Sequence, residues 1–345
     1  MEILIAPISG SLFAAQSAAL WKLTTFDYKP EICFTGSGGG VAVMTAITAN
    51  WSPSKIFAVS SSISSECFIS PWASSKMNIL PSFMNGIIHG SLYNTTRKGE
   101  TLLRDHVTEE TVQGVELWMS AINEISGRVL LASNMTRERS IIRGDKLDTK
   151  LFEYEGLSYM SGNLSLIAKG ILASACIPIM VKSVQIDDQS YVDCGVKYGS
   201  SFTPMFREVL SIARKGGVHM TYIVGCDLTR NPIKKKKTVG LFDHIQLNSS
   251  HATRSHMEYD RNMAHMIITD DCDEDPCYCE FSIKDIAMIL EKRKLARRSL
   301  TEIYPSQSIP LDLVKFTGEQ LTEAIKEYGD YLQVRVWWSG SSDIF

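Results

Sequence analysis

The stretch from Glu31 to Ala49 constrains the fold of this chain more than any other. It begins with a short apolar run, Ile32 to Phe34, continues with glycines around one hydroxyl at Ser37, and becomes a small-residue helix from about Val41. A strand, a tight glycine turn and a helix, in that order, expose a serine at the apex of a strained turn. The positive end of the helix favours an alkoxide or an oxyanion there. The pattern therefore indicates a nucleophilic serine.

The turn itself has almost the spacing Gly-x-Ser-x-Gly. Gly39 stands at the second glycine position and Thr35 at the first, with Gly36 and Gly38 on either side of Ser37. Glycines permit the close approach of strand and helix that such a turn requires. A phosphate-binding turn, or a merely structural one, fits this stretch equally well.

A similar turn precedes this one. Residues 2–8 predict a first strand buried on both faces, and Ser9, Gly10 and Ser11 then lead into an apolar helix over residues 12–23. The two strand-to-helix turns would open at the same carboxyl edge of a parallel sheet, where ligands of α/β proteins bind. We expect the first turn to supply backbone N–H groups that hold an oxyanion, and the second to supply the nucleophile.

A β-hairpin later in the chain ends on a carboxylate. Residues 181–184 and 190–195 predict its two strands, and the second ends at Asp193, two residues before Gly195. The end of a strand would hold this carboxylate in place. Taken alone, an Asp-x-Gly sequence is better interpreted as a plain turn.

The remaining elements follow from apolar periodicity. Further strands are predicted at residues 31–34, 128–133 and 221–226, with residues 152–154 as a candidate for another. Residues 334–338 are either a final strand or a packed tail. Helices are predicted at residues 109–125, 165–175, 241–266, 282–304 and 318–331.

Residues 60–125 are the least legible part of the chain. The apolar segment 70–101 is either a lid over the site or an ordinary packed segment, and we slightly favour the second interpretation. No internal repeat and no low-complexity linker divides the sequence. We therefore expect one domain, residues 1–345, in which residues 60–125 form a lid or an insertion.

Composition excludes several classes of function. The net charge of −3 does not indicate a nucleic-acid binder. No apolar run approaches the ~20 residues that span a bilayer. The first residues lack the basic segment of a signal peptide, and eight cysteines in 345 residues fit reduced thiols. We expect a cytoplasmic protein, with peripheral membrane contact as an option. The run of four lysines at residues 234–237 is interpreted as a solvated loop, in preference to a contact with anionic lipid headgroups.

Metal binding is not the favoured interpretation of any cluster. The acidic, cysteine-bearing loop at residues 270–279 has a spacing that matches no common zinc site, and a surface loop explains it better. The histidines at 244, 251 and 256 do not form an H-E-x-x-H pattern. We expect no metal and no cofactor.

Two stretches together resemble the patatin-like phospholipase family. The first is the turn around Ser37. The second is Ala173–Pro178, followed by Val184–Asp187 and Tyr191–Val196, which matches that family's Ala-Ser-x-Ala-x-Pro, its hairpin containing Ile-Asp, and its Asp-Gly-Gly/Ala-Val in order and spacing. The likeness extends to residues 312–329 and is weakest over residues 60–125.

The resemblance implies a Ser-Asp dyad, with Ser37 as nucleophile and Asp193 as its base. It implies hydrolysis of acyl esters of phospholipids or other acyl lipids through an acyl-enzyme, and it implies that the substrate is met at a peripheral membrane surface. Neither a metal nor a histidine takes part in the reaction that it implies, and no nucleic acid is bound. It also implies an α/β fold, a three-layer α/β/α sandwich around a mostly parallel central sheet. A buried carboxylate can serve as the base because burial raises its basicity. The oligomeric state is left open.

The chain departs from the family pattern in three places: the first loop, the elbow and the residue after the aspartate. The family's first loop is Gly-Gly-Gly-x-Arg/Lys-Gly, whereas here only Gly10 remains and Leu12 replaces the basic residue. Thr35 replaces the first glycine of the elbow, and Cys194 the glycine after the aspartate. Losing one oxyanion donor typically costs ~3 kcal/mol of transition-state stabilisation.

Two other functions compete with the hydrolase. A degenerate patatin-fold protein that binds lipid or acts as a scaffold is the alternative that the altered loop suggests. A Ser-Asp-His α/β-hydrolase fits less well, because its nucleophile follows several strands, whereas Ser37 follows the second.

Overall fold

The computed structural model describes most of the N-terminal half of the chain and selected segments of the remainder. The described residues are 1–6, 9, 13–25, 27–36, 38–70, 90–135, 157–161, 164–178, 180–195, 219–223, 266–268, 278–281, 300–305, 311, 315–330 and 332–337.

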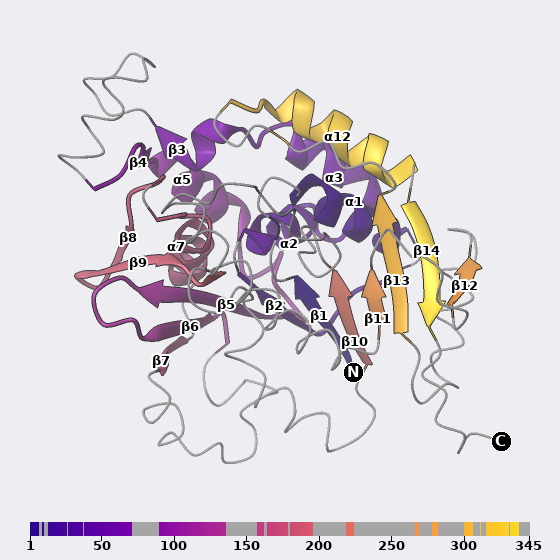
Figure 1. The fold of residues 1–345 in the computed structure, drawn as a ribbon, viewed down its shortest axis with the longest axis horizontal. Helices are drawn as coiled ribbons and strands as arrows, with labels where there is room; N and C mark the ends of the chain where they lie inside the picture. Colours follow the sequence, from indigo (N-terminus) through magenta and orange to yellow (C-terminus); the bar gives the residue numbers. More distant parts are fainter. Residues whose placement is uncertain are drawn as a thin grey trace, which may run out of the picture.

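A mixed β-sheet forms the centre of the described structure (Figure 1). Its strand order is β11-β10-β1-β2-β5-β6-β7, and β9 adds to β5 and carries β8. The strands are β1 (Glu2–Ala6), β2 (Ile32–Thr35), β5 (Glu116–Asn123), β6 (Val129–Ser133), β7 (Leu157–Ser161), β8 (Val184–Ile186), β9 (Gln189–Asp193), β10 (His219–Ile223) and β11 (Met266–Ile268).

Strand direction changes at β5. The run β11-β10-β1-β2-β5 is parallel throughout, and β6 pairs with β7 in parallel. The pairs β5-β6, β5-β9 and β8-β9 are antiparallel. Ile3 to Ala6 of β1 and all four residues of β2 are buried, so both faces of these strands are covered, as is usual for parallel strands in α/β proteins. An α/β fold is confirmed, with a mixed central sheet.

The described helices lie above the sheet in Figure 1. They are α1 (Phe13–Thr24), α2 (Gly39–Thr48), α3 (Pro53–Ser60), α5 (Arg97–His106), α7 (Leu164–Ser174) and α12 (Gly318–Asp330). Helix α1 is apolar around most of its circumference because it packs between α2 and α12. Gly99 lets α5 approach the 3-10 turn Ser65–Cys67, since a Cβ there would lie 1.9 Å from the carbonyl oxygen of Cys67.

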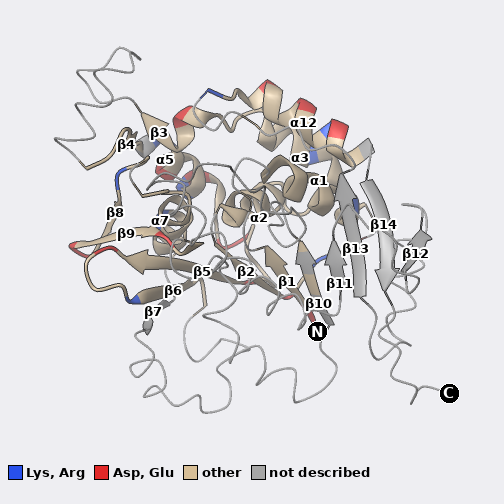
Figure 2. Cartoon of the chain, in the orientation of Figure 1, with Lys and Arg blue, Asp and Glu red and all other residues tan. Residues whose placement is uncertain are grey.

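Helix α12 is amphipathic, and its two faces have different roles. Leu321, Ile325 and Tyr328 are buried at helical spacing, whereas the acidic residues at 319, 323 and 327 are exposed. Figure 2 marks acidic positions in red along this helix. Gly329 at its end lies against Trp21 of α1, where a Cβ would be 2.4 Å from the indole ring. Helix α12 thus packs directly against α1, the first helix of the chain.

Two smaller sheets lie outside the central one. Strands β12 (Tyr278–Phe281), β14 (Leu332–Trp337) and β13 (Leu300–Pro305) form an antiparallel sheet in that order. Strands β3 (Ile69–Ser70) and β4 (Asn94–Thr95) form a short antiparallel pair.

Met119 of β5 is held between two glycines. A Cβ on Gly40 of α2 would lie 2.9 Å from the terminal methyl of Met119, and a Cβ on Gly170 of α7 would lie 3.0 Å from its Cγ. Both helices therefore approach β5 closely because they present no side chain to it.

Two predicted helices are wrong where the structure describes them. Residues 109–125 form a turn and then β5, and residues 300–304 belong to β13. Every residue of β5 is buried, including Glu116, whose Oε1 accepts a hydrogen bond of 2.7 Å from the indole N–H of Trp118. A strand covered on both faces shows no alternation of polar and apolar residues. The apolar residues of this segment therefore have a spacing that also fits one face of a helix.

The other predicted elements agree or lie outside the described residues. Confirmed are the strands that became β1, β2, β6, β9 and β10, and the helices that became α1, α7 and α12. The first hairpin strand, β8, lies two to three residues later than the predicted 181–184, and the choice left open for residues 334–338 is decided in favour of a strand, β14. The predictions for residues 71–89, 152–154, 234–237, 241–265 and 270–277 lie outside the described part of the chain. No helix among the described residues is long and apolar enough to cross a membrane.

The packing of Met119 generates a stability prediction. Gly170→Val should lower the free energy of unfolding by about 1–3 kcal/mol, because the new side chain overpacks against Met119. Thermal and urea denaturation would measure this. Lys169→Val is the matched control, since it introduces the same β-branched residue one position away on the half-buried flank of α7. Equal destabilisation by both variants would contradict the packing argument.

Candidate active site

The carboxyl ends of β2 and β9 meet along one edge of β5. Thr35, the last residue of β2, pairs with Met119, and Asp193, the last residue of β9, pairs with Ala121. The other edge of β5 is occupied by β6, which also pairs with Ala121, so β2 and β9 share an edge. Because β2 runs parallel and β9 antiparallel to β5, their ends point toward each other. Their partner residues on β5 are two positions apart, about 7 Å along the strand.

A tight turn follows β2. The N–H of Gly39 donates to the carbonyl oxygen of Gly36 at 2.8 Å, and Gly38 has φ 86° and ψ −18°. These are the angles that a type II turn requires at its third residue, where glycine is favoured. Helix α2 begins at Gly39, two residues earlier than expected, and has no acidic residue in its first turn. Ser37 itself lies outside the described residues.

Asp193 is held from several sides. Its backbone N–H donates to the carbonyl oxygen of Cys176 at 3.1 Å, which ties the end of β9 to the segment after α7. Its Oδ1 accepts from the N–H of Gly195 at 2.8 Å. The side chain is half-buried. The carboxylate is thus fixed in position by the hairpin and by the Ala173–Pro178 segment.

A pocket joins these elements. The empty space within it is about 700 Å³, a figure that includes space open to solvent. Its lining includes Ser9 from the first turn, Gly38 from the second and Asp193 from the hairpin. Asp193 is the one charged side chain among the described lining residues, and most of the others are apolar.

The first turn contributes a buried hydroxyl. The Oγ of Ser9 is fully buried and has no hydrogen-bond partner among the described residues. A buried hydroxyl without a partner is costly, so a ligand in this pocket would gain by satisfying it. Gly10 and Ser11 lie outside the described residues.

A comparison with protein-family models gives one match. The model described as patatin-like phospholipase matches residues 10–205, more than half of the chain, and its span contains both Ser37 and Asp193. The chain belongs to the patatin-like phospholipase family. A comparison with curated proteins finds no match.

The sequence did not identify the walls of this patatin-like pocket. Tyr93, Val181 and Phe316 all line it, yet they are far apart in the chain. Tyr93 forms a bridge with Val181, its N–H donates to the carbonyl oxygen of Met180 at 2.9 Å, and the ring of Phe316 lies 5.3 Å from that of Phe13. None of these residues belongs to a local motif, so only tertiary structure reveals their role.

A cysteine nucleophile is disfavoured at this site. Cys176 and Cys194 flank Asp193 and both are buried. Burial raises the pKa of the Cys176 thiol far above its usual value, and the nearby charges of Asp193 and Glu124 raise it further. The reactive form of cysteine is the thiolate, which is therefore suppressed here. No group of three metal-ligating side chains gathers within the described residues.

The raised pKa predicts an unreactive thiol. In the folded protein at neutral pH, iodoacetamide should leave Cys176 unmodified, whereas in urea it should alkylate the residue readily. Peptide mapping by mass spectrometry after a timed reaction would show both states. Rapid alkylation of Cys176 in the native protein would contradict the geometry described for this flank of the pocket.

Proposed function

We propose that this protein is a lipid acyl hydrolase that cleaves acyl esters through a covalent intermediate on Ser37, with Asp193 as the base. The family supports lipid acyl hydrolysis in general. What carries the finer proposal is a single observation: Ser9, Gly38 and Asp193, from three separate segments, line one largely apolar pocket.

In the acylation step, the Ser37 hydroxyl attacks the ester carbonyl carbon and its proton passes to the carboxylate of Asp193. Charge develops on the carbonyl oxygen. The backbone N–H groups of Ser9, Gly10 and Ser11, together with the positive end of α2, would stabilise it. Collapse of this tetrahedral intermediate breaks the bond to the alcohol, which leaves with the proton from Asp193.

In the deacylation step, water attacks the acyl-serine and gives its proton to Asp193. The second tetrahedral intermediate expels Ser37, which recovers that proton, and the free fatty acid leaves. The same carboxylate acts as base and then as acid in each step, so no metal, histidine or cofactor is required.

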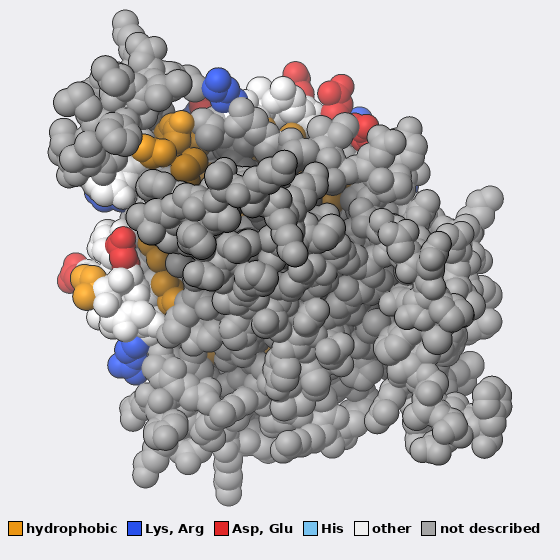
Figure 3. All heavy atoms as spheres, in the orientation of Figure 1, with side chains coloured by type: hydrophobic (Ala, Val, Ile, Leu, Met, Phe, Trp, Pro, Cys, Tyr) orange, Lys and Arg blue, Asp and Glu red, His pale blue; other side chains and the backbone are white. Residues whose placement is uncertain are grey.

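The pocket mouth suits a lipid aggregate. Ile177 and Met180 line the pocket and are 40% and 37% exposed. Figure 3 shows hydrophobic side chains reaching the surface on the side of the molecule where β3, β8 and β9 lie. An apolar rim around a site lowers the cost of contact with a membrane surface. We therefore propose phospholipids or other acyl lipids as substrates, met at a peripheral membrane surface.

The same proposal includes the wider architecture. One domain spans residues 1–345, with further helices on the opposite face of a mostly parallel sheet to complete a three-layer sandwich. Residues 60–125 belong to this domain as a lid or an insertion, and the protein acts in the cytoplasm.

The dyad can be tested by two substitutions. Ser37→Ala and Asp193→Asn should each lower kcat/KM for nitrophenyl esters and phospholipid vesicles by about 10³-fold or more, since each removes a group that the chemistry uses. Asparagine keeps an oxygen that can accept from the N–H of Gly195, so the turn should survive. Circular dichroism would verify folding.

The control for the dyad is Asp188→Asn, on the exposed turn of the same hairpin, which should leave activity unchanged. Wild-type activity no greater than that of either dyad variant on every ester would overturn the hydrolase proposal. The altered oxyanion loop would then favour the alternative, a degenerate family member that binds lipid or acts as a scaffold, and vesicle binding would become the assay.

The apolar rim generates a separate prediction. The double variant Ile177→Asp, Met180→Asp should lower hydrolysis of phospholipid vesicles about tenfold more than hydrolysis of a soluble ester, because two charges oppose contact with the hydrocarbon surface. Ile125→Asp is the matched control, since Ile125 is 89% exposed but does not belong to the rim. A uniform loss on both substrates would show that the rim has no interfacial role.

A further inference from the structure

One hydroxyl group at the pocket lacks a partner in the protein. Ser9 is fully buried, and its Oγ has no hydrogen-bond partner among the described residues. Ser174 lines the same pocket and is equally buried, but its hydroxyl donates to the carbonyl oxygen of Ile171 at 2.9 Å. A buried hydroxyl without a partner destabilises the folded protein, so its presence at a pocket indicates a role with a ligand.

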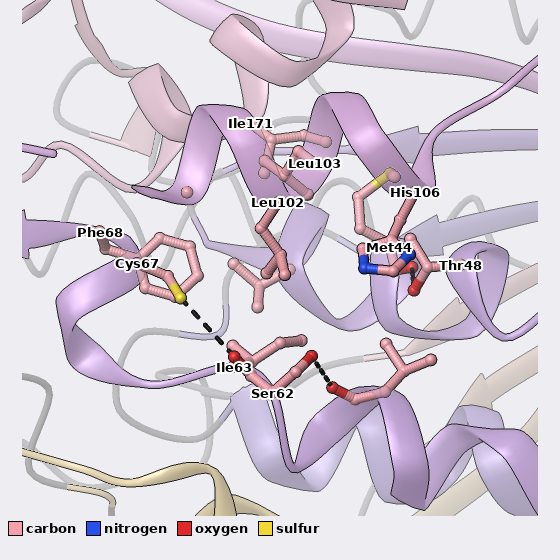
Figure 4. Close-up of a pocket in the computed structure, with 13 residues that line it drawn as sticks. Met44, Thr48, Ser62, Ile63, Cys67, Phe68, Leu102, Leu103, His106 and Ile171 are labelled. Atoms are coloured by element: carbon pink, nitrogen blue, oxygen red, sulfur yellow. Dashed lines mark hydrogen bonds between the residues drawn. The ribbon is translucent and has the colours of Figure 1, made fainter. Parts of the chain in front are cut away.

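A neighbouring cavity between α2, α3, α5 and α7 shows the usual arrangement of such groups. The hydroxyl of Ser62 donates there to the carbonyl oxygen of Val59 at 2.6 Å (Figure 4). The hydroxyl of Thr48 donates to the carbonyl oxygen of Met44 at 2.8 Å. Both hydroxyl groups are thus paired with the backbone of their own segment, in contrast to that of Ser9.

The sheet places Ser9 beside the elbow. Strand β1 ends at Ala6, three residues before Ser9, and Ala6 pairs with Thr35 at the end of β2. Two neighbouring strands, about 4.8 Å apart, therefore lead into their turns at the same level of the sheet. Ser9 then lines the pocket together with Gly38 of the elbow and Asp193. The first turn thus brings this hydroxyl to the pocket where the proposed ester cleavage takes place.

Ser9 is also part of the departure from the family pattern. The family's first loop has a glycine at this position, and a chain that follows that pattern has no side-chain hydroxyl there. Here the side chain adds an O–H group, whose hydrogen rotates to suit its acceptor. Away from water, a hydrogen bond to a charged oxygen is stronger than at a solvated surface. The substituted loop therefore offers a donor that the glycine loop lacks.

We infer that the hydroxyl of Ser9 is a further catalytic group, which donates a hydrogen bond to the oxyanion of the tetrahedral intermediate. This inference rests on the proposed function and adds a side-chain donor to its backbone donors. As Ser37 Oγ bonds to the ester carbonyl carbon, the electron pair of the C=O π bond moves onto the carbonyl oxygen, and the proton of Ser37 passes to Asp193. Ser9 keeps its own proton throughout. Because the hydrogen bond strengthens as the oxygen becomes charged, it lowers the barrier more than it favours substrate binding.

Ser9→Ala tests this inference. It should lower kcat for a nitrophenyl ester about 10²-fold with little change in KM, because one oxyanion donor is lost. The variant should unfold at no lower temperature than wild type, since it removes an unpaired buried hydroxyl. Ser9→Gly is the second variant, because it introduces the residue of the family pattern, and it carries the test if Ser9→Ala does not fold.

The matched control is Ser120→Ala. Ser120 of β5 is also fully buried, and its Oγ has no hydrogen-bond partner among the described residues, but it is not one of the described residues that line the pocket. The same group is thus removed from an equally buried position, and kcat should stay at the wild-type value. A fall in kcat as large as that of Ser9→Ala would show that losing a buried hydroxyl acts through the fold, and would overturn the inference.

A sulfur-substituted substrate separates a donor from a residue that only shapes the loop. In a thiono ester the carbonyl oxygen is replaced by sulfur, which accepts hydrogen bonds weakly. The ratio of kcat for the ester to kcat for its thiono analogue should therefore fall about tenfold or more in Ser9→Ala. A residue that only shapes the loop would lower both rates and leave the ratio unchanged, and that result would contradict the assignment.

The failure of this inference and the failure of the hydrolase proposal give different results. If wild type hydrolyses no ester faster than Ser37→Ala, the hydrolase proposal fails and the inference fails with it. If wild type is active and both Ser9→Ala and Ser9→Gly match its kcat and its ratio of ester to thiono ester, the hydrolase proposal stands and the inference alone is wrong. A selective loss of ester hydrolysis in both variants would support Ser9 as an oxyanion donor.

Discussion

The described structure depends on the way β5 is shared between two partners on one edge. A parallel strand, β2, occupies the first part of that edge, and an antiparallel strand, β9, occupies the next part. The end of each strand is thereby fixed relative to the other by backbone hydrogen bonds to a common neighbour. The glycine turn at the end of β2 and the carboxylate at the end of β9 are therefore brought close together by the sheet. No direct contact between the turn and the carboxylate is needed to position them.

The helices reinforce this arrangement through Met119. Gly40 and Gly170 allow α2 and α7 to close on its side chain from two directions, and the hydroxyl of Thr35 lies 3.0 Å from its sulfur. This explains one departure from the family pattern. Thr35 lies in an extended strand and is buried against Met119, so its backbone does not require glycine. Cys194 is likewise fully buried, which makes it a packing residue beside the carboxylate.

The sequence predicted those parts of the site that depend on local geometry. The turn at Gly38 was predicted because glycines follow a buried strand there. Asp193 was placed at the end of a hairpin strand, and its role as base is what the family resemblance implies. The strand that unites them was mistaken for a helix, since burial on both faces removes the alternation that identifies a strand. Residues such as Tyr93 and Phe316 reach the pocket through long-range packing and leave no local pattern. Periodicity thus predicted the hairpin but not the strand β5 that it pairs with, and the roles of Ser37 and Asp193 stay predictions.

The central claim is that the serine of the elbow reaches the carboxylate at the end of β9. The most direct test is a crystal structure of the protein after reaction with an alkyl phosphonate, compared with that of the unreacted protein. The account predicts a phosphonyl adduct on Ser37 Oγ and, before reaction, a separation of about 2.6–3.2 Å between that atom and the nearer carboxylate oxygen of Asp193. An adduct on another residue, or a separation too long for a hydrogen bond even through one water, would contradict it.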